Sequence, residues 1–166
     1  MTELELRVFD VAWVEAYDSE ILRIGPYVAP WVVGQVHVGS TAVPGLAARP
    51  VIDILLETDG AVDLGRMSAA LAQAGYPTHL SDSLARHRRL YRRIDPEGVG
   101  FHVHAAPLGS AYAQDMIRFR DALRADRALA EAYQALKRSL IARDSRDLAG
   151  YFDAKTAFIA DALARS

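Results

Sequence analysis

Residues 37–56, HVGSTAVPGLAARPVIDILL, contain a Gly-Ser turn, a proline-bounded loop and one carboxylate within an apolar run. The flanking segments 32–38 and 50–56 predict two strands, of which the second is buried on both faces. Asp53 interrupts this second strand. An ionised carboxylate there would cost several kcal/mol without a charged or hydrogen-bonding partner. We therefore expect Asp53 to meet a partner or a ligand.

The turn before this strand has two interpretations. Gly39 lets the backbone approach a ligand closely, and Ser40 or Thr41 can cap a short helix whose first amides face an anion such as phosphate. Alternatively, the segment is a tight connection, with Ser40 as an ordinary helix cap and Asp53 hydrogen-bonded to a neighbouring loop. The residues alone leave both interpretations open.

The run VGSTAVPGLAARPVIDIL resembles the signature of the GrpB family of small bacterial proteins, which is placed in the nucleotidyltransferase superfamily. The resemblance extends to Phe9, Asp10 and Trp13, to YRRIDP and FHVHAAP, and to AYQALKRSL and YFDAKTAFI. It implies an α+β fold with a nucleotidyltransferase-like mixed β-sheet, flanking helices and a C-terminal helical segment. It also implies that residues 1–166 form a single GrpB-like domain. A related domain is fused to dephospho-coenzyme A kinase in some bacteria, so coenzyme A metabolism is one context that the resemblance suggests.

The chain departs from the superfamily at the metal site that the resemblance implies. These enzymes carry two carboxylates at alternate positions of one strand, where they hold divalent metals such as Mg²⁺. Asp53 matches the first position, but Leu55 occupies the second. Val36 stands where the GrpB family usually has Glu, and Arg49 stands where it usually has Lys. The missing carboxylate favours ligand binding over two-metal catalysis.

A His-x-His pattern marks a second candidate strand. His102 and His104 alternate within residues 100–105, so both point to one face while Phe101 and Val103 point to the other. Imidazoles on one face can ligate a metal, bind phosphate oxygens or transfer protons. By resemblance, the pair lies where relatives keep a third carboxylate, so we expect it to face Asp53.

The segment 86–93 holds five arginines and His87. A solvated hairpin face is the usual explanation, but alternation places Arg92 on one face, where it matches a basic position of the family. Nucleic-acid binding is the rival interpretation. The sequence shows no series of stacking aromatics and no basic helix face, and its net charge of -2 gives no general attraction to nucleic acid.

The chain has two lysines, Lys137 and Lys155, beside seventeen arginines, and both match lysine positions of the family. Lys155 lies among Phe152, Phe158 and Ile159, so its stem can cross apolar surface and bring the ammonium group to a phosphate or to Asp53. The alternative is an exposed lysine with a partly covered stem.

Length and composition set the remaining limits. A chain of 166 residues with 51% hydrophobic residues suits one well-filled core. It has no cysteine, which excludes disulfides and thiolate sites. It shows neither an apolar run of membrane-spanning length nor a signal peptide, so we expect a cytoplasmic protein without membrane partners.

Helical periodicity predicts a first helix that is capped by Asp10 and kinked or ended by Pro26. Its apolar stripe is Val14, Tyr17, Ile21, Ile24 and Val28. Further helices are predicted over 61–74, 111–125, 127–142 and 147–164, with Leu148, Phe152, Ile159 and Leu163 as the stripe of the last. Short strands are predicted over 76–80 and 84–94, and a turn at 95–98 joins the latter to the His-x-His strand.

Two functions remain. In the first, the protein binds a nucleotide or another phosphate-containing small molecule at Gly39, Ser40, Thr41, Arg49, Arg92 and Lys155. In the second, it is a divergent nucleotidyltransferase in which Asp53, His102 and His104 hold a divalent metal and act as catalytic residues. Both require Gly39, Ser40, Asp53 and the two histidines to converge on one pocket, which we expect at the edge of the sheet.

Overall fold

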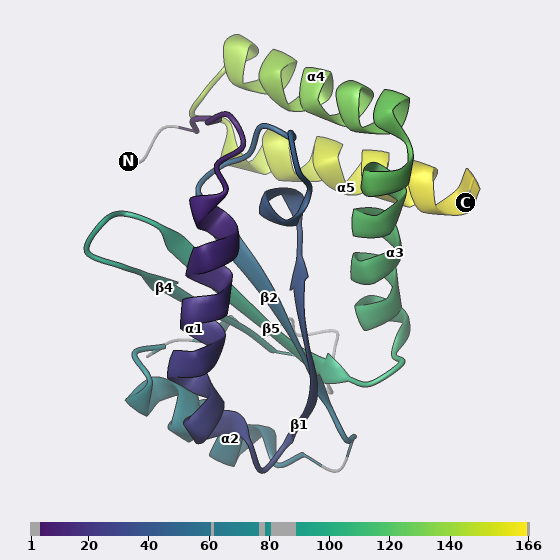
Figure 1. Ribbon diagram of the computed structural model, residues 1–166. Coiled ribbons are helices and arrows are strands. Elements are labelled where there is room, and N and C mark those ends of the chain that lie inside the picture. The colour runs from purple at the N-terminus through teal and green to yellow at the C-terminus, as the bar shows by residue number, and fades with distance from the viewer. Residues whose placement is uncertain (1–3, 61, 77–78, 81–88, 166) are drawn as a thin grey trace.

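The computed structural model describes residues 4–60, 62–76, 79–80 and 89–165 and confirms the α+β class (Figure 1). Within this part of the chain, five strands form one mixed sheet in the order β1-β2-β5-β4-β3. The strands are β1 (Val32–Val38), β2 (Val51–Thr58), β3 (His79–Leu80), β4 (Arg89–Ile94) and β5 (Gly100–Pro107). The helical elements are α1 (Ala12–Val28), the 3-10 turn η1 (Ser40–Ala42), α2 (Leu64–Gln73), α3 (Ala111–Ala125), α4 (Arg127–Arg143) and α5 (Leu148–Arg165).

Strand register decides which side chains share a face. β1 runs antiparallel to β2, β2 runs parallel to β5, and β4 runs antiparallel to β5. Val38 is paired with Asp53, Asp53 with His102, and His102 with Arg92. Directly paired residues project from the same face of a sheet, so these four side chains lie on one face. Leu55 and His104 are also paired and lie on that face, one pleat further along.

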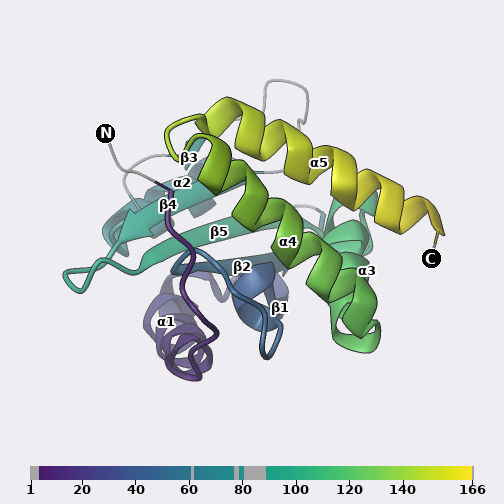
Figure 2. The same ribbon diagram turned by 90° about the horizontal axis from the view of Figure 1, so that it is seen from above.

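The other face carries the larger core, which α1 and α2 cover. Helix α1 lies on one side of the sheet, whereas α4 and α5 lie on the opposite side (Figure 2). The alternate positions Ile52, Ile54 and Leu56 of β2 are fully buried there. They join a cluster that includes Trp13, Ile24, Val28, Met67, Leu71, Tyr91, Phe101 and Val103. On the opposite face of the strand Leu55 is fully buried but Asp53 is partly exposed, so the predicted burial on both faces holds only in part.

A second cluster holds the loop between β1 and β2, residues 39–50, against the C-terminal helices. Val43 and Leu46 from the loop pack with Phe119 and Leu123 from α3 and with Tyr133 from α4. Because hydrophobic burial holds the loop on all three C-terminal helices, it also sets the position of the turn that leads into β2. No helix in the described residues is long and apolar enough to cross a membrane.

Most element boundaries agree with the sequence, and the differences have local causes. Helix α3 spans the predicted residues, α4 ends one residue later than predicted, and α5 begins and ends one residue later than predicted. Helix α2 begins three residues later than predicted, because the Asp63 carboxylate accepts hydrogen bonds from the amides of Gly65 and Arg66 and caps the helix there. Residues 77–78 and 84–88 of two predicted strands lie outside the described residues.

The ends of α1 and the buried face of α5 test three predictions about helices. The Asp10 carboxylate accepts a hydrogen bond from the amide of Ala12, the first residue of α1, and so caps this end of the helix as predicted. Pro26 does not end α1, which continues to Val28. In α5, Leu148 and Phe152 are exposed whereas Tyr151 is buried, because packing on α4 and the N-terminal segment selects a different face from the one the apolar residues suggest.

Candidate functional site

Gly39 brings the backbone against the Asp53 carboxylate. Its φ of +73° lies in the left-handed region, which side chains other than hydrogen rarely tolerate. A Cβ atom at this position would overlap Oδ2 and Cγ of Asp53. Two independent constraints, the backbone conformation and the close approach of Asp53, therefore require glycine here.

The hydroxyls after Gly39 do not cap a helix, contrary to expectation. Gly39 is the N-cap of η1, and the Ser40 and Thr41 hydroxyls make other contacts. Lys137 Nζ donates to Ser40 Oγ at 3.3 Å, and Thr41 Oγ1 donates to the Val51 carbonyl at 3.1 Å. Thr41 is buried away from the cavity described below. A 3-10 turn of three residues also has little dipole to offer an anion.

Asp53, His102 and His104 form a compact cluster. Asp53 Oδ1 lies 3.2 Å from His104 Nε2 and 3.4 Å from His102 Nδ1. One ligand atom from each residue fits within 4.8 Å of the others, which is a spacing that a single metal ion can bridge. The Asp53 side chain is 24% exposed, so the cluster is open to a ligand. The two histidines share one face as the alternation predicts, and that face is the one of Asp53, as the resemblance implies. Because β2 and β5 are inner strands, the cluster does not lie at the sheet edge.

The charge of Asp53 is stabilised by its neighbours. Burial by itself raises the pKa of Asp53, but the hydrogen bonds and charge interactions with His102 and His104 outweigh it and hold the pKa well below its usual range. Asp53 is therefore an ionised acceptor at neutral pH, as a metal ligand must be.

Tyr112 orients one of the histidines. Its hydroxyl lies 2.7 Å from His104 Nδ1, while His104 Nε2 faces Asp53. A histidine whose second ring nitrogen is hydrogen-bonded keeps one ring orientation, and this arrangement is common beside metal ions. Helix α3 thus supplies a support that the strand pattern does not reveal.

A cavity of about 440 Å³ opens over the cluster. Its lining comes from the Gly39 turn, from β2 and β5, and from all three C-terminal helices. The residues are Gly39, Ser40, Asp53, His104, Tyr112, Asp115, Met116, Phe119, Tyr133, Lys155, Thr156, Ile159, Ala160 and Leu163. His102 contacts Asp53 but does not line the cavity.

Both lysines lie at this site. Lys155 lines the cavity, with its Nζ 5.2 Å from the centroid of the Tyr151 ring. Burial lowers the pKa of Lys155, and nearby Asp53 acts in the opposite direction. Lys137 is 1% exposed, and its Nζ donates to the Ala47 carbonyl at 2.5 Å as well as to Ser40. Burial, with a smaller effect of Lys155, lowers the pKa of Lys137 to about 7.

The two arginines predicted to bind the ligand lie outside this cavity. Arg92 is exposed on the face of the sheet that carries His102, and the Arg49 guanidinium lies 5.9 Å from the centroid of the Phe152 ring. Neither side chain is part of the cavity lining.

Leu55, at the position where the resemblance implies a second carboxylate, belongs to the hydrophobic core. Leu55 is fully buried and packs with Val38, Ala106 and Ala113. Val36, where the resemblance implies Glu, packs against the same cluster. Both departures thus replace acidic groups by apolar contacts between the sheet and α3.

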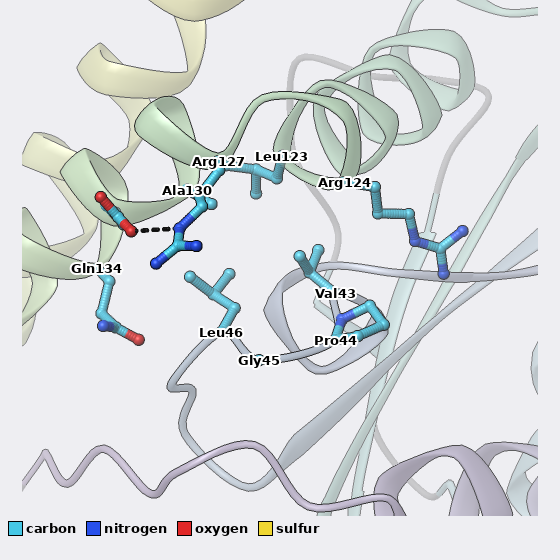
Figure 3. Close-up of a pocket in the computed structure, with 10 residues that line it drawn as sticks. Val43, Pro44, Gly45, Leu46, Leu123, Arg124, Arg127, Ala130 and Gln134 are labelled. Carbon is cyan, nitrogen blue, oxygen red and sulfur yellow. Dashed lines mark hydrogen bonds and ion pairs between the residues drawn. The ribbon is translucent and has the colours of Figure 1, made fainter.

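A larger cavity of about 620 Å³ lies behind the same loop, between residues 43–46 and helices α3 and α4 (Figure 3). Arg124 and Arg127 lie at this cavity, but the first donates to the Ala42 carbonyl and the second to Glu131. Because its polar groups are already used and no Asp-His cluster faces it, we place the candidate site in the smaller cavity.

Sequence reasoning missed Tyr112, Tyr133 and the cavity role of Met116. The rarity of lysine pointed to Lys137, yet its contact with Ser40 connects residues 97 positions apart and follows only from the packing of α4 on the loop. Nothing in the sequence around Tyr112 and Tyr133 distinguishes an aromatic residue that lines a cavity from one that is buried in the core.

Solved structures with similar folds include a GrpB protein from Enterococcus faecalis, with a TM-score of 0.75 and 24% identity over 95% of this chain and 98% of that one. Cid1, a protein with RNA terminal uridylyl transferase activity, aligns with a TM-score of 0.56 and 15% identity over 80% of this chain and 42% of its own. At these identities, the likenesses show the fold alone. They confirm a nucleotidyltransferase-like fold.

Sequence comparison extends over almost the whole chain. A UPF0157 protein of Halalkalibacterium halodurans is 30% identical over 163 residues, which cover 98% of this chain and 82% of the relative. The family model described as GrpB protein matches residues 3–165. The protein therefore belongs to the GrpB family.

Proposed function

We propose that this protein binds a phosphate-containing small molecule through a divalent cation held by Asp53, His102 and His104. The observation that carries the proposal is the convergence of three ligand atoms within 4.8 Å beneath a cavity large enough for a small metabolite. A nucleotide is one member of this ligand class.

The donor set favours some metals over others. One carboxylate oxygen and two imidazole nitrogens suit Mn²⁺, Fe²⁺ or Zn²⁺, whereas Mg²⁺ prefers oxygen ligands throughout. Three protein ligands leave coordination positions open toward the cavity. A bound cation supplies positive charge that attracts and polarises phosphate oxygens.

The surrounding side chains support an anionic ligand. Lys155 lines the cavity and contributes a positive charge close to Asp53. Ser40, which also lines the cavity, is held by Lys137. Because partly buried charges attract more strongly than exposed ones, Lys155 favours a phosphate group at this end of the cavity.

Binding rather than nucleotidyl transfer is favoured by Leu55. Two-metal transfer needs a second carboxylate beside the first, and Leu55 is buried among apolar groups. Glu57 lies on the same strand face as Leu55, but two residues and about 6 to 7 Å further along the strand. Its carboxylate faces Gly34, so it does not replace the missing ligand.

Calorimetric titration of the metal-free protein with Mn²⁺, Zn²⁺ and Mg²⁺, followed by inorganic phosphate and AMP, tests the proposal. We expect Mn²⁺ or Zn²⁺ to bind more tightly than Mg²⁺, and phosphate compounds to bind only the metal-loaded protein. His102→Ala should weaken both events, whereas Glu97→Gln in the exposed turn between β4 and β5 should change neither. Metal binding that survives His102→Ala unchanged would contradict the proposed site.

A transfer assay separates this proposal from the alternative of a divergent nucleotidyltransferase. The protein is incubated with α-labelled ATP, CTP, GTP or UTP, Mn²⁺ and a cell extract as the source of acceptors. We expect little or no transfer of label. Transfer that disappears in Asp53→Asn would show that one carboxylate and two histidines suffice for catalysis.

A further inference from the structure

The cavity above Asp53 changes character along α3 and α5. Tyr112, at the start of α3, contacts His104, and Met116 and Phe119 follow one and two turns later. On α5, Lys155 is followed by Ile159 and Leu163, and eight residues of helix span about 12 Å. The cavity therefore runs from a polar end at the cluster to an apolar end between the two helices.

The apolar end is open to a ligand. Met116, Ile159 and Leu163 are only partly buried, although each packs against a buried cluster of the core. Their remaining exposed surface faces the cavity that they line. A ligand that covers this surface removes it from water, and such burial is favourable in proportion to its area.

Two polar side chains lie near the apolar end, and each has a contact within its own helix. The Asp115 carboxylate lies 3.4 Å from an Arg118 guanidinium nitrogen, and Thr156 Oγ1 donates to the Phe152 carbonyl at 2.9 Å. A nucleobase placed here would bury several ring and exocyclic polar atoms with few partners, which is unfavourable. A hydrocarbon group has no such requirement.

We propose, building on the phosphate and metal binding proposed above, that the ligand is a phosphate monoester whose body is an alkyl or aryl hydrocarbon. The phosphate lies at the metal and Lys155, and the hydrocarbon extends between α3 and α5 along Met116, Ile159 and Leu163. This assigns to the cavity a ligand class other than nucleotides, and it assigns the specificity to the C-terminal helices.

Calorimetry with Mn²⁺-loaded protein and a series of phosphate compounds tests this inference. The probes are inorganic phosphate, methyl phosphate, butyl phosphate, hexyl phosphate, phenyl phosphate and AMP. Each methylene group that becomes buried tightens binding by about fourfold. We expect hexyl phosphate to bind at least about tenfold more tightly than methyl phosphate and more tightly than AMP.

Two variants locate the hydrocarbon. Met116→Gln and Ile159→Gln should each weaken hexyl phosphate by about tenfold more than they weaken inorganic phosphate, with Mn²⁺ affinity reporting that the protein is folded. Leu108→Gln is the matched control, because Leu108 is 61% exposed and lies outside the cavity. It should leave the whole series unchanged.

The outcomes separate this inference from the function on which it rests. Equal affinity for methyl and hexyl phosphate, or tighter binding of AMP than of hexyl phosphate, would overturn the hydrocarbon ligand and leave the phosphate site standing. Equal losses for hexyl phosphate and inorganic phosphate in the glutamine variants would also overturn it. If no phosphate compound binds the Mn²⁺-loaded protein, the proposed function fails and the inference fails with it.

Discussion

Two carboxylates on opposite sides of the sheet, Glu20 and Asp53, have opposite surroundings. On the α1 side, Glu20 is 3% exposed and accepts hydrogen bonds from Arg23, Arg93 and Tyr76. On the α3 and α5 side, Asp53 is 24% exposed, and its described polar contacts are two imidazoles. Arginine stays charged at any ordinary pH, whereas imidazole exchanges protons and coordinates metals.

The difference separates a structural carboxylate from one that we propose to bind a ligand. Glu20 Oε1 and Oε2 both receive guanidinium donors, so no lone pair faces an open space. Burial tends to raise the pKa of Glu20, but Arg23, Tyr76 and Arg93 lower it overall. The network joins α1 to β4, and Arg23 also donates to the Ala74 carbonyl beyond α2. Asp53 keeps accessible surface beneath a cavity, so its charge is available to a ligand.

The largest effect on stability is expected for Glu20→Gln. The change leaves two guanidinium groups facing a neutral amide at a buried position, and breaking a buried ion pair in this way costs about 3 kcal/mol of unfolding free energy. Urea denaturation followed by circular dichroism measures the loss. Metal affinity of the folded variant should stay at its original value. A loss below about 1 kcal/mol would place Glu20 with ordinary surface ion pairs.

Asp53→Asn should show the reverse pattern. The amide keeps the shape of the side chain but loses the charge, so Mn²⁺ or Zn²⁺ affinity should fall by about 100-fold or more while stability changes by only about 1 kcal/mol. Calorimetry and urea denaturation on the same preparation give both quantities, with Glu97→Gln as the control. If Asp53→Asn lowered the free energy of unfolding strongly and left the metal affinity unchanged, Asp53 would be a structural group like Glu20.

The sequence predicts the Asp53 side of this comparison better than the Glu20 side. Strand periodicity places His102 and His104 on one face, and the apolar run around Asp53 indicates a carboxylate that needs a partner. That the two meet was expected from the family resemblance. Glu20, Tyr76 and Arg93 belong to elements far apart in the chain. Their meeting depends on how α1 packs on the sheet, and periodicity contains no information on such long-range partners.

The same limit explains the errors within the site. Ser40 and Thr41 have the residue type of helix caps, but the packed fold offers their hydroxyls Lys137 and the Val51 carbonyl instead. Arg49 has the charge for a phosphate contact, yet its guanidinium lies over the Phe152 ring. Residue type indicates what a side chain can do, and tertiary packing selects among those contacts.

Lys137 sharpens the comparison as a buried charge whose described partners are neutral: the Ala47 carbonyl, the Ser40 hydroxyl and the Tyr133 ring. Its pKa is lowered from 10.5 to about 7 by burial, so between these values the unfolded state binds the extra proton. The free energy of unfolding should therefore rise with pH over this window. Between pH 7 and 9, we expect metal-free protein to gain about 2 kcal/mol more than Lys137→Met.

Urea denaturation at several pH values measures this difference, and other titrating groups cancel because the variant retains them. Parallel pH profiles for the two proteins would show that Lys137 keeps an ordinary pKa. In that case, the contacts of Lys137 would offset the effect of burial on its pKa, as the contacts of Glu20 do.

The smallest effect, and the finest test of how the Asp53 side is organised, is expected for Tyr112→Phe. The ring remains, but the hydroxyl that lies 2.7 Å from His104 Nδ1 is lost, so the imidazole is free to turn. Loss of such a supporting hydrogen bond weakens metal binding by about tenfold. Stability should change little, since Tyr112 is only partly buried. Calorimetry with Mn²⁺ or Zn²⁺ measures the change, with Tyr27→Phe on α1, across the sheet from the site, as the control. Unchanged metal affinity in Tyr112→Phe would mean that Asp53 and the strand backbone alone hold His104 in place, and that α3 contributes a cavity wall but no orientation of the metal ligands.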